Sequence, residues 1–322
     1  MHAHAVVKPA STPLETLLAG VEESMRKATR LAVSSTASMA DCASQSQAPG
    51  AMQAAQYHLV SGGQRVRAQL ALRAGLALGL SDGDAVCIAC CCELLHNASL
   101  IHDDLQDRDH LRHGKPAVWA FYGNNIAICT GDLMLSAAYG SLCQLSDPRL
   151  LPAMLACVHE RTASAIAGQC SDLSMQDDRF QHIDDYLNIA RAKSGALLSL
   201  PIELALLAAN FGAYTSVARR AAEAFSISYQ IVDDLHDTEQ DGARHDRLQG
   251  LNIVFFLEKM TQNNNGDQSD QPPRAARAAA RQLGLHYIQS AEECAVQLPR
   301  AAGAFLLELA QNLRGALTKE PF

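Results

Sequence analysis

Aromatic side chains and strand-like patterns are scarce in this chain of 322 residues. Only 5% of the residues are aromatic, whereas 48% are hydrophobic and alanine is abundant. Few segments alternate β-branched with polar residues, as exposed strands do. This composition favours packed helices over a sheet, and it supplies enough apolar mass for one large core or at most two medium domains. The chain is therefore predicted to be all-α.

The chain also lacks an excess of basic charge. It carries 26 Lys and Arg against 34 Asp and Glu, a formal net charge of −8. Non-specific nucleic-acid binding needs a basic face that displaces phosphate counterions, and no Lys/Arg stripe interleaved with aromatics occurs. We expect no nucleic-acid partner. An anionic substrate would need metal ions or a local basic patch.

Cysteine patterns typical of zinc sites or disulfide frameworks are missing. The ten cysteines are scattered, apart from Cys87 and the run 90–92. This run contains one CxxC, but neither a second CxxC nor a zinc-like histidine spacing follows it. We interpret these four cysteines as small packing residues of a buried helix. Free thiols suit a reducing cytoplasm, where we expect the protein to reside.

Signal peptides and membrane spans are also not indicated. Residues 1–13 lack the unbroken apolar core of a secretory signal and are predicted to form a flexible tail. The most apolar stretch, residues 196–214, is interrupted by Pro201, Glu203 and Asn210. It is more typical of a buried helix than of a membrane span.

Apolar residues recur at helical spacing from Leu14 onward, with short breaks. The one long polar insert, residues 262–273, is rich in Asn, Gln, Asp and Pro, and the same helical pattern resumes after it. No internal repeat of fixed period occurs. We predict one all-α domain over residues 14–322, with a surface loop at 262–273.

Two of the predicted helices end in the same acidic pattern. The first begins near Ser81, which has capping-box spacing to Asp84, and runs to about residue 107. The second covers about residues 216–237. Their last residues read Asp103-Asp104-Leu-Gln-Asp107 and Asp233-Asp234-Leu-His-Asp237.

The spacing within these motifs points to divalent cations. Residues four apart share one face of a helix, so the first and last aspartates of each motif can share a ligand. Clustered carboxylates at a helix C-terminus repel one another and oppose the macrodipole, a cost that Mg²⁺ would offset. One acidic triplet of this spacing is expected by chance about 0.4 times. Two all-aspartate copies are far harder to dismiss. The predicted metal ligands are Asp103, Asp104, Asp107, Asp233, Asp234 and Asp237.

Basic residues accompany the acidic motifs. The segment after the first motif carries Arg112, His113 and Lys115, and an earlier loop, residues 62–67, offers backbone amides and guanidiniums. Lys193 lies among small residues. Each alone would more often be a surface charge. As a set around two aspartate motifs, they indicate a phosphate and metal site.

Several segments match the landmarks of one family in the right order. Residues 93–107 look like the first aspartate-rich motif of the trans-prenyl diphosphate synthases, and residues 112–116 resemble the arginine loop that follows it. Further matches are Gly131-Asp132, Gly168-Gln169, Lys193-Ser194 and residues 229–237. The resemblance covers about residues 62–237. It implies an all-α helical bundle of the isoprenoid synthase type, usually a homodimer, with two aspartate motifs facing each other across a deep cavity.

The resemblance also implies the chemistry. Three Mg²⁺ would bridge the two motifs to an allylic diphosphate, which ionises to a carbocation, and isopentenyl diphosphate would then add five carbons. The implied catalytic residues are Asp103, Asp104, Lys193 and Asp233. The implied substrate contacts are Arg112, Lys193 and Gln230 near the allylic diphosphate, and Gln64, Arg67, His96 and His113 near isopentenyl diphosphate.

Departures from the family pattern concentrate in the isopentenyl diphosphate pocket. Gln64 and Leu251 stand where the family has lysines, and His113 stands where it has an arginine. Charge-assisted contacts are each worth roughly 1.5–3 kcal/mol, so losing several would weaken that pocket by orders of magnitude. We infer that isopentenyl diphosphate binds weakly or differently, or that another acceptor replaces it.

Alternative functions follow because the residues that would ionise the substrate match the family, whereas those that would bind isopentenyl diphosphate do not. A terpene cyclase-like enzyme would ionise a preformed prenyl diphosphate without a second diphosphate. A non-catalytic partner subunit would not need two complete aspartate motifs, and a di-iron site would need a second Glu-x-x-His besides Glu93 and His96. For an elongating enzyme, the small Ala98 and Ser99 upstream of Asp103 predict products of twenty carbons or more.

Overall fold

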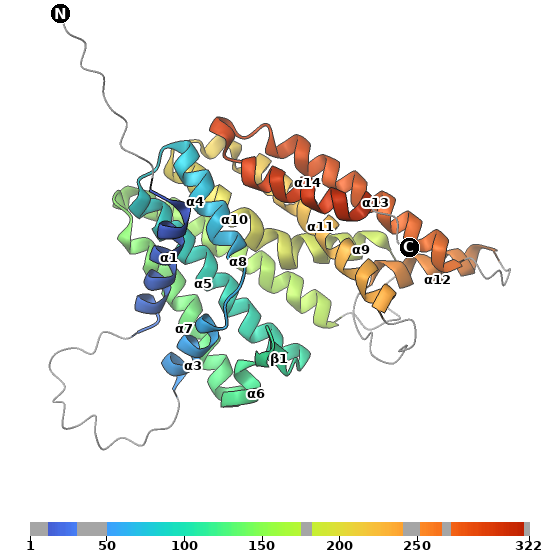
Figure 1. The fold of residues 1–322 in the computed structure, drawn as a ribbon, viewed down its shortest axis with the longest axis horizontal. Helices are drawn as coiled ribbons and strands as arrows, with labels where there is room; N and C mark the ends of the chain where they lie inside the picture. Colours follow the sequence, from blue (N-terminus) through green and yellow to red (C-terminus); the bar gives the residue numbers. More distant parts are fainter. Residues whose placement is uncertain (1–11, 31–49, 175–181, 241–251, 266–271, 319–322) are drawn as a thin grey trace, which may run out of the picture. The chain divides into compact units, whose positions relative to one another are not determined.

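The computed structural model describes residues 12–30, 50–174, 182–240, 252–265 and 272–318 (Figure 1). Within these ranges the regular structure is helical, apart from one two-stranded antiparallel ribbon, and this confirms the predicted all-α class. The chain divides into two compact units, Met1–Leu72 with Ser81–Ser146 and Arg73–Leu80 with Asp147–Phe322. Each unit is described by itself, and the single domain over 14–322 stays a prediction.

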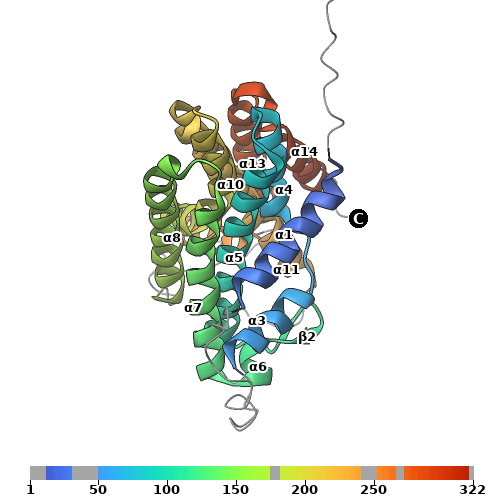
Figure 2. The ribbon, with the colours of Figure 1, turned by 90° about the vertical axis from the view of Figure 1, so that its left-hand side faces the viewer.

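The first unit is organised around the helix that carries the first aspartate motif. This helix, α5 (Asp82–Asp107), packs against both α1 (Leu14–Ala28) and α7 (Asn124–Ser141) (Figure 2). The unit also contains α3 (Ala51–Val60), β1 (Leu111–Arg112), β2 (Lys115–Pro116), α6 (Val118–Tyr122) and the 3-10 turn η1 (Leu142–Gln144), while α4 (Val66–Leu78) runs from this unit into the second.

The first helix begins where the apolar pattern begins. α1 starts at Leu14 and buries Leu17, Val21 and Met25, which are spaced four residues apart along one face. The start of this helix agrees with the prediction. Most of the tail predicted before it, residues 1–11, lies outside the described residues.

The bounds of α5 also agree with the prediction. Ser81 is its N-cap and accepts a hydrogen bond of 3.1 Å from the Asp84 amide. The helix ends because Arg108 takes the left-handed conformation, at a φ of 61°. The four clustered cysteines, Cys87 and 90–92, are buried in its middle, as the sequence predicted.

Two helices of the described residues, α5 and α7, are long and apolar enough to cross a membrane by length and composition alone. In α5, 72% of the apolar window is buried within the protein, and in α7, 44%. α5 is therefore a core helix of its unit. The stretch noted in the sequence begins with α10 (Ala196–Ala208), which is buried from Ala196 to Leu206, so the predicted buried helix is confirmed.

The second unit is organised around the helix with the second aspartate motif. This helix, α11 (Thr215–Gln240), packs against α10, α13 (Pro272–Ala295) and α14 (Ala304–Thr318). The other elements are η2 (Pro148–Leu150), α8 (Leu151–Ser174), α9 (Ile183–Ala190), the π-helix η3 (Arg191–Gly195), η4 (Gly212–Tyr214), α12 (Ile253–Asn265) and η5 (Pro299–Ala301).

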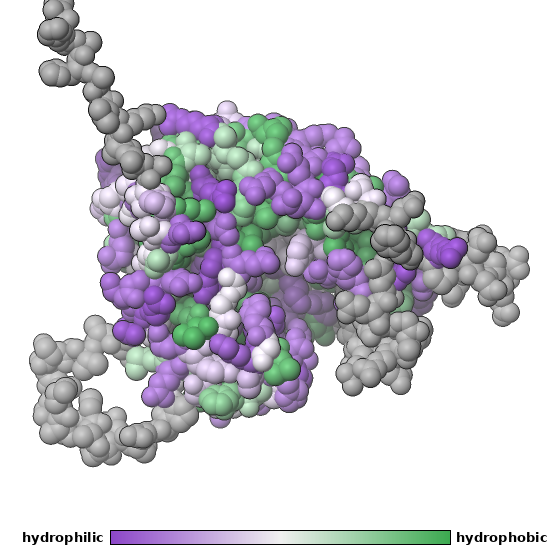
Figure 3. All heavy atoms as spheres, in the orientation of Figure 1, coloured by the Kyte–Doolittle hydropathy of each residue, from purple (hydrophilic) through white to green (hydrophobic). Residues whose placement is uncertain are grey.

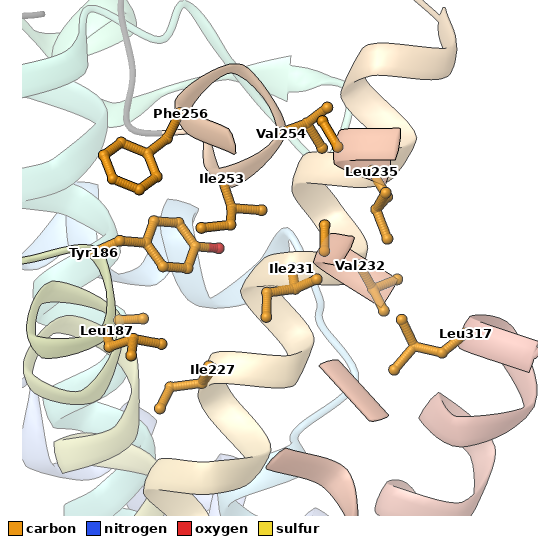
Figure 4. Close-up of a cluster of buried hydrophobic side chains, with 13 residues drawn as sticks. Tyr186, Leu187, Ile227, Ile231, Val232, Leu235, Ile253, Val254, Phe256 and Leu317 are labelled. Carbon is orange, nitrogen blue, oxygen red and sulfur yellow. The ribbon is translucent and has the colours of Figure 1, made fainter. Parts of the chain in front are cut away.

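Side chains from α9, α11, α12, α13 and α14 form one buried apolar cluster in this unit (Figure 4). Tyr186 of α9 is the largest fully buried side chain described, and it lies beside Ile253 and Phe256 of α12. Ile231 of α11 is equally inaccessible to solvent. The face of the protein drawn in Figure 3 is mostly hydrophilic, with interspersed apolar residues, as expected when the apolar helix faces point inward.

The predicted surface loop at 262–273 is shorter than the sequence suggested. α12 continues to Asn265 and α13 already begins at Pro272, so only residues 266–271 separate the helices, and they lie outside the described residues. The composition misled the prediction at both ends. Asn and Gln only weakly disfavour a helix, and proline fits the first turn because the amide it lacks has no helical partner there.

Candidate active site

The first aspartate motif presents three carboxylates in different environments at the end of α5. Asp103 is half-buried, Asp107 is exposed, and Asp104 is only 1% exposed. The guanidinium of Arg112 donates to Asp104 Oδ1 from its Nε at 2.9 Å and also from Nη2. Burial raises the pKa of Asp104, and the hydrogen bond from Arg112 opposes that rise. The middle aspartate is therefore held by an internal cation.

A tight hairpin places Arg112 beside Asp104. Arg112 pairs with Lys115 across the β1–β2 ribbon, and the two residues between them, His113 and Gly114, have φ angles of 50° and 76°. Two-residue hairpin loops commonly require positive φ at both positions. The arginine loop noted in the sequence is thus a folded hairpin.

The three aspartates of the second motif repeat the pattern of burial seen in the first. Asp234 is 2% exposed, Asp233 is half-buried and Asp237 is exposed. Asp234 Oδ2 accepts hydrogen bonds of 2.8 Å from the Tyr186 hydroxyl and 2.8 Å from the Ile253 amide. These contacts join α9, α11 and the start of α12 through one carboxylate.

Gln230 completes the surroundings of Asp234. Its Nε2 donates to Asp234 Oδ1 at 3.0 Å, one helical turn away on α11. The sequence predicted that Gln230 contacts the allylic diphosphate. The structure gives its amide nitrogen an internal partner, because residues four apart on a helix meet, and the contact with the diphosphate stays a prediction.

The outer aspartates of each motif suit a cation. Burial and, next, the charge of Asp237 raise the pKa of Asp233 to about 6, so the metal-free cluster resists carrying its full charge. Among the described residues, no three His, Cys, Asp or Glu side chains converge to hold a metal by themselves. Mg²⁺ is commonly held by one or two carboxylates together with substrate phosphates. The pairs Asp103 with Asp107 and Asp233 with Asp237 fit that mode.

Lys193 lies in an irregular turn that is itself tightly packed. The π-helix η3 replaces a regular turn here, and such bulges are frequent at functional sites. A Cβ on Gly168 of α8 would lie 2.5 Å from the Lys193 amide nitrogen, so only glycine permits this approach. Lys193 Nζ lies 2.5 Å from Asp172 Oδ2, one turn further along α8. The sequence reasoning missed Asp172, although its spacing to Gly168-Gln169 was available as a signal.

The residues predicted to bind isopentenyl diphosphate lie in the first unit. Gln64 is exposed, and Arg67 and His96 are half-buried. Burial and, next, the charge of Arg67 hold the pKa of His96 well below its ordinary value. A second imidazole, His58 of α3, is buried, and its pKa is lowered to about 4. Both of these rings are therefore neutral at physiological pH and add no cationic charge to the predicted pocket.

Arg65, which the sequence reasoning did not single out, has a structural role in that loop. It lies at a φ of 51°, its Nη2 donates to the Leu59 carbonyl at 3.1 Å, and its guanidinium reaches the buried Glu93 at 3.9 Å. Glu93 also accepts from the Ala68 amide at 2.9 Å. These contacts fix the glycine-rich loop against α5.

The predicted site residues thus fall into two groups. The first unit holds Gln64, Arg67, His96, Asp103, Asp104, Asp107, Arg112 and His113, and the second holds Lys193, Gln230, Asp233, Asp234 and Asp237. Arg67, Arg112 and His58 act together on the pKa of His96, so these groups lie close to one another. Leu251 lies outside the described residues.

Comparison with known proteins agrees with the order of these motifs. Residues 49–251 match the family model of the polyprenyl synthetases. The chain belongs to the polyprenyl synthetase family. The resemblance inferred from the aspartate motifs is therefore confirmed.

Curated relatives carry the names of farnesyl, geranylgeranyl and short chain isoprenyl diphosphate synthases. A (2E,6E)-farnesyl diphosphate synthase of Mycobacterium tuberculosis is 37% identical over 177 residues, which is 54% of this chain and 48% of the relative. The chloroplastic geranylgeranyl pyrophosphate synthase of Capsicum annuum is 30% identical over 210 residues, 63% of this chain and 57% of the relative. The chain spans about half the length of the curated relatives it matches.

Solved structures share the fold over nearly the whole chain. A decaprenyl diphosphate synthase from Rhodobacter capsulatus superposes with a TM-score of 0.77 at 20% identity, covering 95% of this chain and 98% of that one. A geranylgeranyl pyrophosphate synthetase from Geoglobus acetivorans gives a TM-score of 0.75 at 21% identity, covering 94% and 99%. Both likenesses support the isoprenoid synthase type of fold.

Proposed function

We propose that this protein is a Mg²⁺-dependent trans-prenyltransferase. An allylic prenyl diphosphate ionises and releases diphosphate, and the double bond of isopentenyl diphosphate attacks the allylic cation. Loss of a proton then gives a trans-prenyl diphosphate of twenty carbons or more. The observation that carries this proposal is that both aspartate motifs of this polyprenyl synthetase chain repeat the same pattern of burial. In each motif the middle aspartate is buried and held by internal partners, whereas the first is half-buried and the last is exposed.

The outer aspartates would hold the metal. Asp103 and Asp107 on α5 would hold Mg²⁺ at the first motif, and Asp233 and Asp237 on α11 would hold it at the second, with up to three ions in all. Bound Mg²⁺ neutralises the charge that develops on the leaving diphosphate. A cation also favours the ionised carboxylate, which offsets the raised pKa of Asp233.

The basic residues would position the diphosphate and stabilise its departure. Arg112 is oriented by Asp104 and presents its remaining N–H groups to the phosphate oxygens. Lys193 is held by Asp172 and supplies a second cation. The two motifs belong to different units of the chain.

The acceptor side would bind isopentenyl diphosphate through few charges. Arg67 supplies a permanent cation, whereas Gln64 is uncharged and the neutral ring of His96 contributes only hydrogen bonds. We therefore propose a weak or selective acceptor pocket. The same observation keeps a second candidate open, an enzyme that ionises its substrate and needs no second diphosphate.

Two further properties belong to this proposal. α7 exposes Ile128 and α8 exposes Leu155, Ile166 and Leu173, and apolar helix surfaces of this kind favour a homodimer. The described cysteines are all free thiols, which supports a cytoplasmic location.

Mass spectrometry of the products tests the proposal. Purified protein with Mg²⁺ receives dimethylallyl, geranyl or farnesyl diphosphate, each with and without isopentenyl diphosphate. Longer diphosphates that form only with isopentenyl diphosphate support the proposal, and Asp103→Asn should abolish them. Hydrocarbons or alcohols formed without isopentenyl diphosphate would replace it with the cyclase function, and no product from any substrate would contradict both.

A further inference from the structure

A histidine ring of α5 lies directly on the backbone of α7. A Cβ built on Gly131 would be 2.2 Å from His102 Nε2 and 2.6 Å from Cδ2, well inside van der Waals contact. The same Nε2 lies 3.5 Å from the Ile128 carbonyl and 3.7 Å from Asp132 Oδ1. Gly131 is therefore the residue that lets the ring of His102 rest on α7.

This contact lies next to the first aspartate motif, because His102 directly precedes Asp103. A helix turns about 100° per residue. With His102 as the origin, Asp103 and Asp107 therefore lie at about 100° and 140° around α5, and Asp104 lies at about 200°. The face proposed to bind metal is thus flanked by His102 on one side and by Asp104 on the other.

Both flanks are fastened to other elements. On one side His102 rests against Gly131 of α7, and on the other Asp104 is held by Arg112 of the hairpin. Rotation of the last turn of α5 in either direction would disturb one of these contacts. The face between them is therefore fixed in direction before any ligand arrives.

We propose that His102 is a positioning residue that sets the direction of the Asp103 and Asp107 carboxylates, and that Gly131 is required for this role. The inference rests on the proposed metal site at these two aspartates. Side chains that orient metal ligands typically change metal affinity by 10–100-fold when they are altered. Displacing the ring with a Cβ on Gly131 should have an effect of that order.

The test measures how Mg²⁺ stabilises the protein in saturating inorganic diphosphate. Thermal melts at increasing Mg²⁺ give the concentration for half of the full stabilisation. Gly131→Ala should raise this midpoint by about tenfold or more. Gly140→Ala is the matched control, since it lies on the same helix with nothing within 4 Å of the added Cβ, and its midpoint should equal that of the wild type.

A double variant separates positioning from simple packing strain. His102→Ala removes the ring and should raise the Mg²⁺ midpoint. Adding Gly131→Ala to His102→Ala should cause no further change, because the Cβ then has space. An equal effect of Gly131→Ala with and without the ring would overturn the proposal. If Gly131→Ala does not fold, His102→Ala alone decides, and an unchanged midpoint overturns the role of the ring.

The outcomes also separate this inference from the function on which it rests. Wild-type protein that Mg²⁺ and diphosphate do not stabilise would contradict the metal site itself, and the inference with it. Wild-type protein that is stabilised, with unchanged midpoints in Gly131→Ala and His102→Ala, would overturn only the inference.

Discussion

The hydroxyl of Tyr186 donates a hydrogen bond of 2.8 Å to Oδ2 of Asp234, and both side chains are buried. A carboxylate that the sequence predicted as a metal ligand thereby joins α9 to α11. Because Asp234 accepts three internal hydrogen bonds, we propose that it supports the second motif structurally, and Asp233 and Asp237 remain the predicted ligands of a cation.

Removing the Tyr186 hydroxyl should destabilise the second unit. Tyr186→Phe leaves Asp234 with one donor fewer in a buried site, which costs about 1–3 kcal/mol. Urea unfolding should show that loss, whereas Tyr214→Phe, at a position that is 39% exposed, should change stability by less than about 0.5 kcal/mol. Equal stabilities of the two variants would contradict a supporting role for this hydrogen bond.

The pKa of Asp233 predicts how stability depends on pH without metal. Its folded-state pKa of about 6 lies above the ordinary 3.8, so the folded protein favours the protonated carboxyl. The stability it contributes is full below pH 3.8 and is lost as pH rises through 6. Wild-type protein should lose about 1–2 kcal/mol over this window relative to Asp233→Asn.

A second variant tests the origin of that shift. Asp237→Asn removes the neighbouring charge that helps to raise the pKa of Asp233, so the loss of stability should move to lower pH. Mg²⁺ with diphosphate should oppose the loss at pH 7. Identical pH profiles for wild type and Asp233→Asn would show that another group controls the dependence.

Restoring charge to the acceptor pocket should improve the binding of isopentenyl diphosphate. Gln64→Lys with His113→Arg adds two permanent cations at exposed positions. With charge-assisted contacts of roughly 1.5–3 kcal/mol each, the KM should fall by tenfold or more. Gln144→Lys, an exposed change on η1, is the matched control and should leave the KM unchanged. An unchanged KM in the double variant would count against the weakened pocket.

Product length should respond to the side chain at Ala98. This residue is 3% exposed on α5, five residues before Asp103, and we predict that a growing chain would run past it. Ala98→Phe should shorten the products seen by mass spectrometry, and Ala98→Val should do so to a smaller degree. The same product distribution in the wild type and in both variants would show that the side chain at position 98 does not set product length.

Much of the fold and the position of the site could be predicted from the sequence. The cap at Ser81, the end of α5 and the two aspartate motifs all rest on local patterns, whereas α11 runs to Gln240, three residues past its predicted end. The unequal burial within each motif could not be predicted, because it depends on partners brought in by folding. Tyr186 lies 48 positions before Asp234, and its contact exists only because α9 packs on α11.

Other features could not be predicted from the sequence, for related reasons. The π-helix around Lys193 packs closely on Gly168, a contact between residues 25 positions apart that no local propensity encodes. The loop predicted at 262–273 was too long because composition marks helix ends poorly. The pairing of Lys193 with Asp172 joins the π-helix to α8 across α9, and the spacing of Asp172 to Gly168-Gln169 was its one signal in the sequence.

The buried thiols of α5 give this protein a built-in chemical reporter. Burial raises the pKa of Cys87 and Cys90 to about 12, so at neutral pH they are protonated as well as shielded from solvent. An alkylating reagent can modify them only while α5 is open, and the exposed Cys129, Cys143 and Cys170 would react first. Peptide mapping would separate the slow phase of alkylation, at the buried cysteines, from the fast phase. The rate of the slow phase would report how often the helix with the first aspartate motif opens, and no cysteine would have to be introduced.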